Sequence, residues 1–114
     1  MIAPRQLTVR LLAAGRVVWW CADAEECAEY YGLTQRRAEE LGCRLVNAYL
    51  PKAESAEQWP APDAVFLSKG DIHDPENLLG HYREKHRLQA ARRLPAFEVF
   101  VRPDPALMAL VATD

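Results

Sequence analysis

Two apolar segments near the start of the chain have the pattern of a β-hairpin. The segment Leu7 to Leu12, LTVRLL, places apolar side chains at alternate positions along one face. The segment Val17 to Cys21, VVWWC, is rich in the β-branched and aromatic residues that favour strands. Gly15 between them can adopt the positive φ that a tight reversal needs. The pattern therefore predicts a hairpin whose second strand, apolar on both faces, lies inside a sheet.

The following stretch, Trp20 to Cys43, allows two interpretations. Asp23, with Glu26 three residues later, is a capping-box pattern and predicts a helix that begins at Ala24. At ~100° per residue, an unbroken helix from Ala24 to Leu41 has one wide apolar stripe. Gly32 would then lie in the middle of that helix, where glycine costs about 1 kcal/mol relative to alanine. A break at Gly32 would instead give a helix-turn-helix.

These two interpretations lead to different functions. The sequence favours the unbroken helix, which would be a packing element for the sheet. The alternative is a helix-turn-helix DNA-binding regulator that uses residues 24–43. Its groove-contacting residues would be the four at the start of the second helix, Thr34, Gln35, Arg36 and Arg37. The formal net charge of −2 and the neighbouring Glu39 and Glu40 disfavour contact with a phosphate backbone.

The remainder of the chain predicts three strands and one further helix. The apolar runs that predict strands are Arg44–Leu50, Ala64–Leu67 and Phe97–Arg102. Pro51 to Pro62 holds three prolines and predicts a surface loop. Asp74 followed by Pro75 is a helix-start signal, which predicts a helix from Pro75 to about Ala91. The apolar tail after Pro105 can be a short helix or a strand.

The order β-β-α-β-β-α-β predicts a single α+β domain over residues 1–114. In this domain, a mainly antiparallel sheet of about five strands carries both helices on one face. The 114 residues are 50% apolar, enough for one core. The chain has no run of about 18 apolar residues, so a membrane span is not expected. Three cysteines without close pairing favour a reduced, cytoplasmic protein.

Residues with reactive side chains form no recognisable catalytic or metal-binding pattern. His81 and His86 are five residues apart, so on a helix their rings would lie about 140° apart and could not share one ion. The cysteines lack the paired spacing of zinc sites. The only glycine of LSKGD does not make a phosphate-binding loop. We therefore expect a protein without catalysis, cofactor or metal.

Aromatic residues and a basic segment point instead to binding. Trp19 and Trp20 should face opposite sides of one strand, so one builds the core and the other must be covered by a helix, a partner or a second copy. The segment Arg83 to Arg93 carries five cations, which can form a patch for RNA, DNA or an acidic partner, although the pattern favours a solvated helix face. We expect a small binding or regulatory module that acts through protein–protein contact or as a homodimer. Its predicted partner-binding residues are Trp19, Trp20, Phe100, Arg83 and Arg87.

Overall fold

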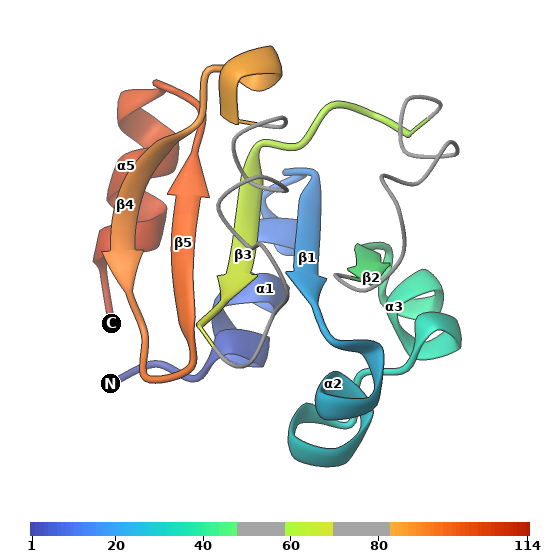
Figure 1. Cartoon of the computed structure of the whole chain (residues 1–114). Coiled ribbons are helices and arrows are strands. Elements are labelled where there is room, and N and C mark those ends of the chain that lie inside the picture. Colours follow the sequence, from blue (N-terminus) through green and yellow to red (C-terminus); the bar gives the residue numbers. More distant parts are fainter. Residues whose placement is uncertain (48–58, 70–82) are drawn as a thin grey trace.

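The computed structural model describes residues 1–47, 59–69 and 83–114, and within them the chain forms one five-stranded sheet (Figure 1). The strand order is β2-β1-β3-β5-β4. The strands are Val18–Ala22 (β1), Arg44–Asn47 (β2), Ala64–Ser68 (β3), Gln89–Arg93 (β4) and Phe97–Val101 (β5). β1 pairs in parallel with β2 and β3, whereas β5 pairs antiparallel with β3 and β4. The α+β class and the five strands are confirmed, but the sheet is mixed rather than mainly antiparallel.

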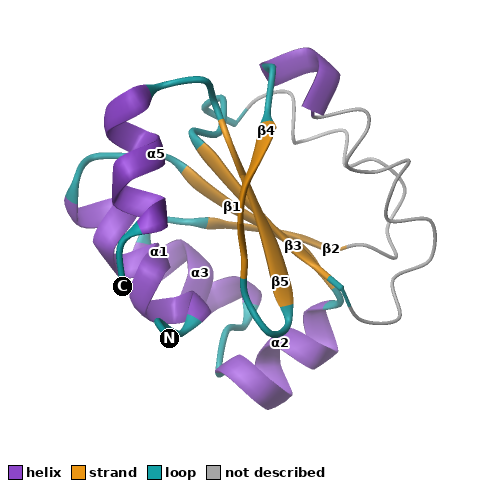
Figure 2. Cartoon of the chain, turned by 90° about the vertical axis from the view of Figure 1, so that its left-hand side faces the viewer, coloured by secondary structure: helices purple, strands orange, loops and turns teal. Residues whose placement is uncertain are grey.

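The four longest helices of the described residues pack on one face of this sheet (Figure 2). They are α1 (Pro4–Ala13), α2 (Ala24–Tyr31), α3 (Gln35–Leu41) and α5 (Pro105–Ala112). One core cluster joins them to the sheet, with Leu7 and Leu11 from α1, Leu107 from α5, and Trp20 and Phe66 from the strands. The prediction that both expected helices lie on one face is wrong for the second of them. Its described part, residues 83–86, lies against the other face, where His86 meets the Trp19 ring and Arg83 lies over Phe100. None of these helices has the length and apolar character needed to cross a bilayer.

The predicted first strand, Leu7–Leu12, is wrong, because these residues belong to α1. Pro4 occupies the first turn, where a missing N–H costs nothing. Leu7 and Leu11 are both fully buried. Their spacing of four residues fits one face of a helix as well as alternate positions of a strand. Gly15 does adopt a positive φ of 76°, but it ends the helix instead of turning a hairpin.

The unbroken helix from Ala24 to Leu41 is also wrong, because the chain turns at Gly32. Gly32 has a φ of 60°, which is the left-handed conformation that ends α2. The turn brings Leu33 into the core at 1% exposure, where a continuous helix would have pointed it to solvent. The Thr34 hydroxyl accepts a hydrogen bond from the Arg37 N–H at 3.0 Å and caps α3. Asp23 caps α2 as expected, with its carboxylate accepting from the Glu25 N–H at 2.7 Å.

The strands predicted in the second half are present. β3 and β5 match Ala64–Leu67 and Phe97–Arg102 closely, and β2 covers the described part of Arg44–Leu50. The tail after Pro105 is helical. The predicted end of the helix Pro75–Ala91 is wrong, since residues 83–86 are helical but β4 begins at Gln89. The start of that helix and residues 51–58 of the predicted loop lie outside the described residues.

The second face of the sheet carries its own apolar cluster. Trp19, Cys21, Val65 and Phe100 project from the strands on this side. Leu88 belongs to this cluster, and Trp59 packs against it. Every residue of β1 is buried, which confirms the prediction that this strand lies inside the sheet. Sheet strands with both faces covered read as continuous apolar runs, as VVWWC does.

Candidate functional site

Trp20 is part of the core on the helix-covered face. Its side chain is fully buried and lies against the rings of Phe66 and Phe97, with centroid separations of 5.6 and 4.7 Å. Its indole N–H donates to the Thr8 hydroxyl at 2.9 Å, and that hydroxyl donates to the Pro4 carbonyl at 2.9 Å. Trp20 therefore connects the sheet to α1 and presents no surface to a partner.

Trp19 and Phe100 are buried on the opposite face. The Trp19 ring meets the rings of Trp59 and His86 edge-on, at 5.4 and 5.8 Å between centroids. Phe100 is 4% exposed, and the Arg83 guanidinium lies 5.6 Å from its ring centroid. The chain itself thus supplies the cover that the sequence left open between a helix, a partner and a second copy. A direct role of these aromatic residues in partner binding stays a prediction. It was based on an exposed aromatic surface, and both residues are buried.

The three cysteines are buried free thiols. Burial raises the pKa of Cys21 and of Cys27 to about 12, and it also raises the pKa of Cys43. A catalytic cysteine needs an accessible thiolate, which this environment disfavours. Across residues 1–47, 59–69 and 83–114, no three metal-ligating side chains come together. His81 lies outside these ranges.

The four residues of the helix-turn-helix alternative lie around the start of α3 and are all exposed. Arg36 forms an ion pair with Glu40 at 3.5 Å, and Arg37 pairs with the same carboxylate at 3.1 Å. The Thr34 hydroxyl is already used as the helix cap. The preceding helix α2 adds Glu25, Glu26 and Glu29, so the surface around the two arginines is not basic. The turn at Gly32 that this alternative needs is present. However, the two arginines that would contact DNA are already paired with Glu40.

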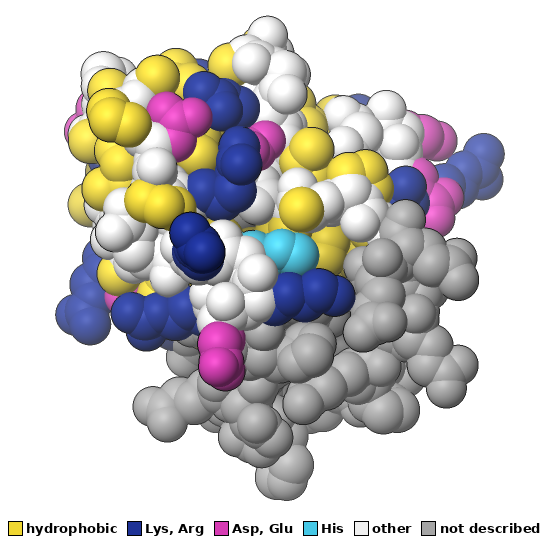
Figure 3. Space-filling model, turned by 90° about the horizontal axis from the view of Figure 1, so that it is seen from above, with side chains coloured by type: hydrophobic (Ala, Val, Ile, Leu, Met, Phe, Trp, Pro, Cys, Tyr) yellow, Lys and Arg dark blue, Asp and Glu magenta, His cyan; other side chains and the backbone are white. Residues whose placement is uncertain are grey.

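The outer face of α5 is an exposed apolar surface that the sequence analysis missed. All eight residues of this helix, PALMALVA, are apolar. Leu107 and Val111 point into the core, and the opposite side forms an exposed stripe, called here the α5 stripe, of Pro105, Ala106, Ala109 and Ala112. In Figure 3, apolar side chains gather at the upper left, where α5 lies. Asp104 before Pro105 is the same helix-start signal as Asp74 before Pro75 and could have identified this helix from the sequence.

Helix α1 lies beside α5 and is tied to its end by Arg10. The Arg10 guanidinium donates to the carbonyls of Leu110, at 3.1 Å, and of Thr113. A cation at a helix C-terminus compensates the negative end of the helix dipole. Val9 of α1 is also an exposed apolar residue, at 50% exposure. Neither α1 nor α5 carries an acidic residue.

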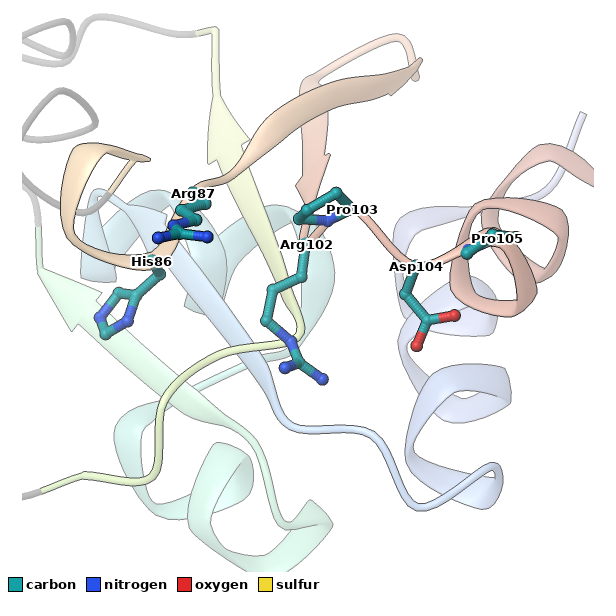
Figure 4. A pocket seen from close by; sticks show the side chains of 6 residues that line it. All are labelled: His86, Arg87, Arg102, Pro103, Asp104 and Pro105. Atoms are coloured by element: carbon teal, nitrogen blue, oxygen red, sulfur yellow. The ribbon is translucent and has the colours of Figure 1, made fainter.

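A pocket of about 440 Å³ opens at the other end of α5 (Figure 4). Three of its residues come from the chain that links β5 to α5, and two come from the turn before β4. Its lining residues are His86, Arg87, Arg102, Pro103, Asp104 and Pro105. Arg87 was predicted to bind a partner together with Arg83, and the structure places Arg87 in this pocket and Arg83 over Phe100.

No protein-family model, curated protein or solved structure matches this chain. Its function is therefore inferred from its own residues and their geometry.

Proposed function

We propose that this protein is a non-catalytic binding module that acts through protein–protein contact, and that its partner is a second copy of the same chain. The contact surface is the α5 stripe together with the neighbouring part of α1 around Val9. The observation that supports this proposal is the composition of α5, which is apolar on all sides although half of its residues are exposed.

A helix that is hydrophobic all round is usually buried, whereas a surface helix has a polar outer face. The α5 stripe has no charged or hydrogen-bonding side chain to interact with water. Its alanines are small, so a second helix can approach its backbone closely. An uncharged surface is also complementary to itself, which is the condition that a twofold-symmetric interface imposes. These features favour a second copy over a partner of strong charge.

The proposal is tested by sedimentation velocity over a series of protein concentrations. We expect the wild-type protein to convert from monomer to dimer as the concentration rises. Ala109→Lys places a charge in the centre of the α5 stripe and should weaken dimerisation by about tenfold or more, since the charge would lose its water in the interface. The matched control is Ala28→Lys, which changes an exposed alanine of α2 in the same way and should leave dimerisation unchanged.

Two results would contradict self-association. One is a wild-type protein that sediments as a monomer at every concentration. The other is an equal loss of dimer in the Ala28→Lys control, because a general charge effect would then explain both variants. Far-UV circular dichroism of each variant checks that the fold is retained, since both positions are exposed in helices and lysine has a helix propensity close to that of alanine.

The second candidate is the DNA-binding regulator, which the turn at Gly32 favours. In that alternative, Arg36 and Arg37 contact the duplex from the start of α3. The acidic side chains of α2 and the shared pairing with Glu40 oppose it. A gel shift with random duplex at low salt separates the two functions: retention that disappears in Arg36→Ala supports DNA binding, and no retention of the wild type rejects it.

A further inference from the structure

Two charged residues that line the pocket at the start of α5, Arg102 and Asp104, each form an ion pair with a residue outside its lining. Asp63, 8% exposed, receives the Arg102 guanidinium on one oxygen and the Val17 N–H at 2.7 Å on the other. Asp104 accepts the Arg16 guanidinium at 3.1 Å on one oxygen. Its other oxygen caps the first turn of α5, accepting from Ala106 N–H at 3.0 Å. Each acid near the pocket is therefore neutralised by its own cation.

Within the part of the chain that the structure describes, Arg87, unlike Arg102, forms no ion pair with a carboxylate near the pocket. It lines the same pocket, and among the described residues its side chain has no hydrogen bond or ion pair. Arg102 is held by Asp63 and by its own backbone N–H, which donates to the Asp63 carbonyl at 3.0 Å. Its side chain is still 44% exposed, so most of its five N–H donors are not used by this single carboxylate contact. One fixed guanidinium and one uncompensated guanidinium therefore border one hollow.

The topology places these two arginines at the same end of one strand pair. Gln89 of β4 faces Val101 of β5, so Arg87 lies just before the first strand and Arg102 just after the second. Figure 4 shows the side chains of Arg102 and Asp104 extending to the same side of the chain that leads into α5. Because the β-ladder pairs Gln89 with Val101, the backbones of Arg87 and Arg102 are held at the same end of this strand pair.

The backbone of Arg87 has an unusual conformation for an arginine. Its φ of 57° is the one positive value at a non-glycine residue in the described parts of the chain. The Leu88 N–H donates to the Arg83 carbonyl at 3.0 Å, so Arg87 occupies the left-handed position that ends the preceding helical turn. Glycine is the usual residue there because it has no Cβ penalty. Arginine is less favourable than glycine for the backbone at this position, but it adds a positive charge to the pocket.

We propose that this pocket binds a small organic phosphomonoester. A phosphoryl group presents oxygens that match the planar fork of a guanidinium, and two arginines on one phosphate are a common means of recognition. The pocket volume of about 440 Å³ lies within the range of small-molecule sites. Pro103 and Pro105 supply rigid apolar walls for the organic part of such a ligand. Asp104 is available as a hydrogen-bond acceptor for a ligand hydroxyl, since its charge is already balanced by Arg16.

The proposal is tested by titrating the full chain with inorganic phosphate and with ribose 5-phosphate while recording backbone amide chemical shifts by NMR. Ionic strength is held constant with chloride. We expect saturable shifts confined to the amides of residues 86–88 and 102–106, with ribose 5-phosphate binding more tightly than phosphate. Arg87→Gly should weaken binding of both probes by about tenfold or more. Because glycine suits the backbone at this position, the variant should keep its fold, and the same spectra verify it.

Two further variants separate a site from general charge. Arg87→Lys keeps the charge but loses the fork, so it should bind with intermediate affinity. Arg36→Ala removes another exposed cation, on α3, and should leave both affinities unchanged. Shifts that spread over all basic residues without saturation, or an Arg87→Gly variant that binds as well as the wild type, would overturn the proposal. Tighter binding of an oligothymidylate than of ribose 5-phosphate would also overturn it, because the ligand would then be a nucleic-acid backbone.

Discussion

The hydrogen bond between Trp20 and Thr8 gives a sharp test of how the sheet is held to α1. Both side chains are buried, at 0% and 3% exposure, and the Thr8 hydroxyl accepts the indole N–H at 2.9 Å. Thr8→Val keeps the shape of the side chain and removes the acceptor. The indole N–H would then be buried without that partner, and we expect the free energy of unfolding to fall by about 1–3 kcal/mol.

The same substitution should cost much less when the donor is also absent. In the Trp20→Phe variant the indole N–H is absent, so Thr8→Val leaves no buried indole donor without a partner. Replacing both partners of a hydrogen bond by apolar groups changes the free energy of unfolding little. A double-mutant cycle over the four proteins should therefore give a coupling energy of about 1–2 kcal/mol. Urea unfolding followed by far-UV circular dichroism measures each stability without using tryptophan fluorescence, which the substitution changes. A cost of Thr8→Val that is equal in both backgrounds would refute the role assigned to this hydrogen bond.

Three further predictions concern the turn, the cysteines and the acid at the start of α5. Gly32→Ala should lower the free energy of unfolding by about 1–2 kcal/mol in a urea titration, because its φ of 60° disfavours a side chain. The three buried thiols, with raised pKa values, should not react with Ellman's reagent at mildly alkaline pH until denaturant is added, and fast reaction of the native protein would contradict their burial. Hydrogen bonds from the backbone and from Arg16 lower the pKa of Asp104 in the folded state, so its stabilising effect is present at neutral pH and is lost as pH falls through that lowered pKa. The stability advantage of the wild type over Asp104→Asn, which keeps the cap, should accordingly disappear in acid, and an advantage that persists there would contradict the assignment.

Some elements could be predicted from the amino-acid sequence alone, because their local signals agree with their burial in the fold. β1, β3 and β5 are short apolar runs bounded by turn residues and rich in valine and aromatic residues, so their β propensity agrees with their burial. The Asp23 cap fixes the start of α2, because a carboxylate there satisfies backbone N–H groups that have no partner within the helix. The α+β class follows from these elements, as does the interior position of β1.

The site residues were less predictable than the fold. Arg87 was selected from a basic run in a predicted helix, but its place beside Arg102 arises only from the pairing of β4 with β5. The α5 stripe could have been found from Asp104 and Pro105, which signal a helix, but its exposure depends on which side of α5 meets the core. A sequence pattern shows that a helix has an apolar side, and it cannot show whether a helix that is apolar on every side is covered.

Two features of the first forty residues depend on tertiary packing: the helical conformation of Pro4–Ala13 and the turn at Gly32. The spacing of Leu7 and Leu11 satisfies a helix and a strand equally, and the core space behind Trp20 selects the helix, because Thr8 then reaches the indole N–H. Gly32 could remain in a helix at a cost of about 1 kcal/mol, but the turn at this residue buries Leu33, which contributes about 1.5–3 kcal/mol. The alternation of side chains along a strand decides which face of the sheet each tryptophan occupies. The residues that cover each face come from distant parts of the chain. Burial therefore depends on the packed molecule and not on the local sequence.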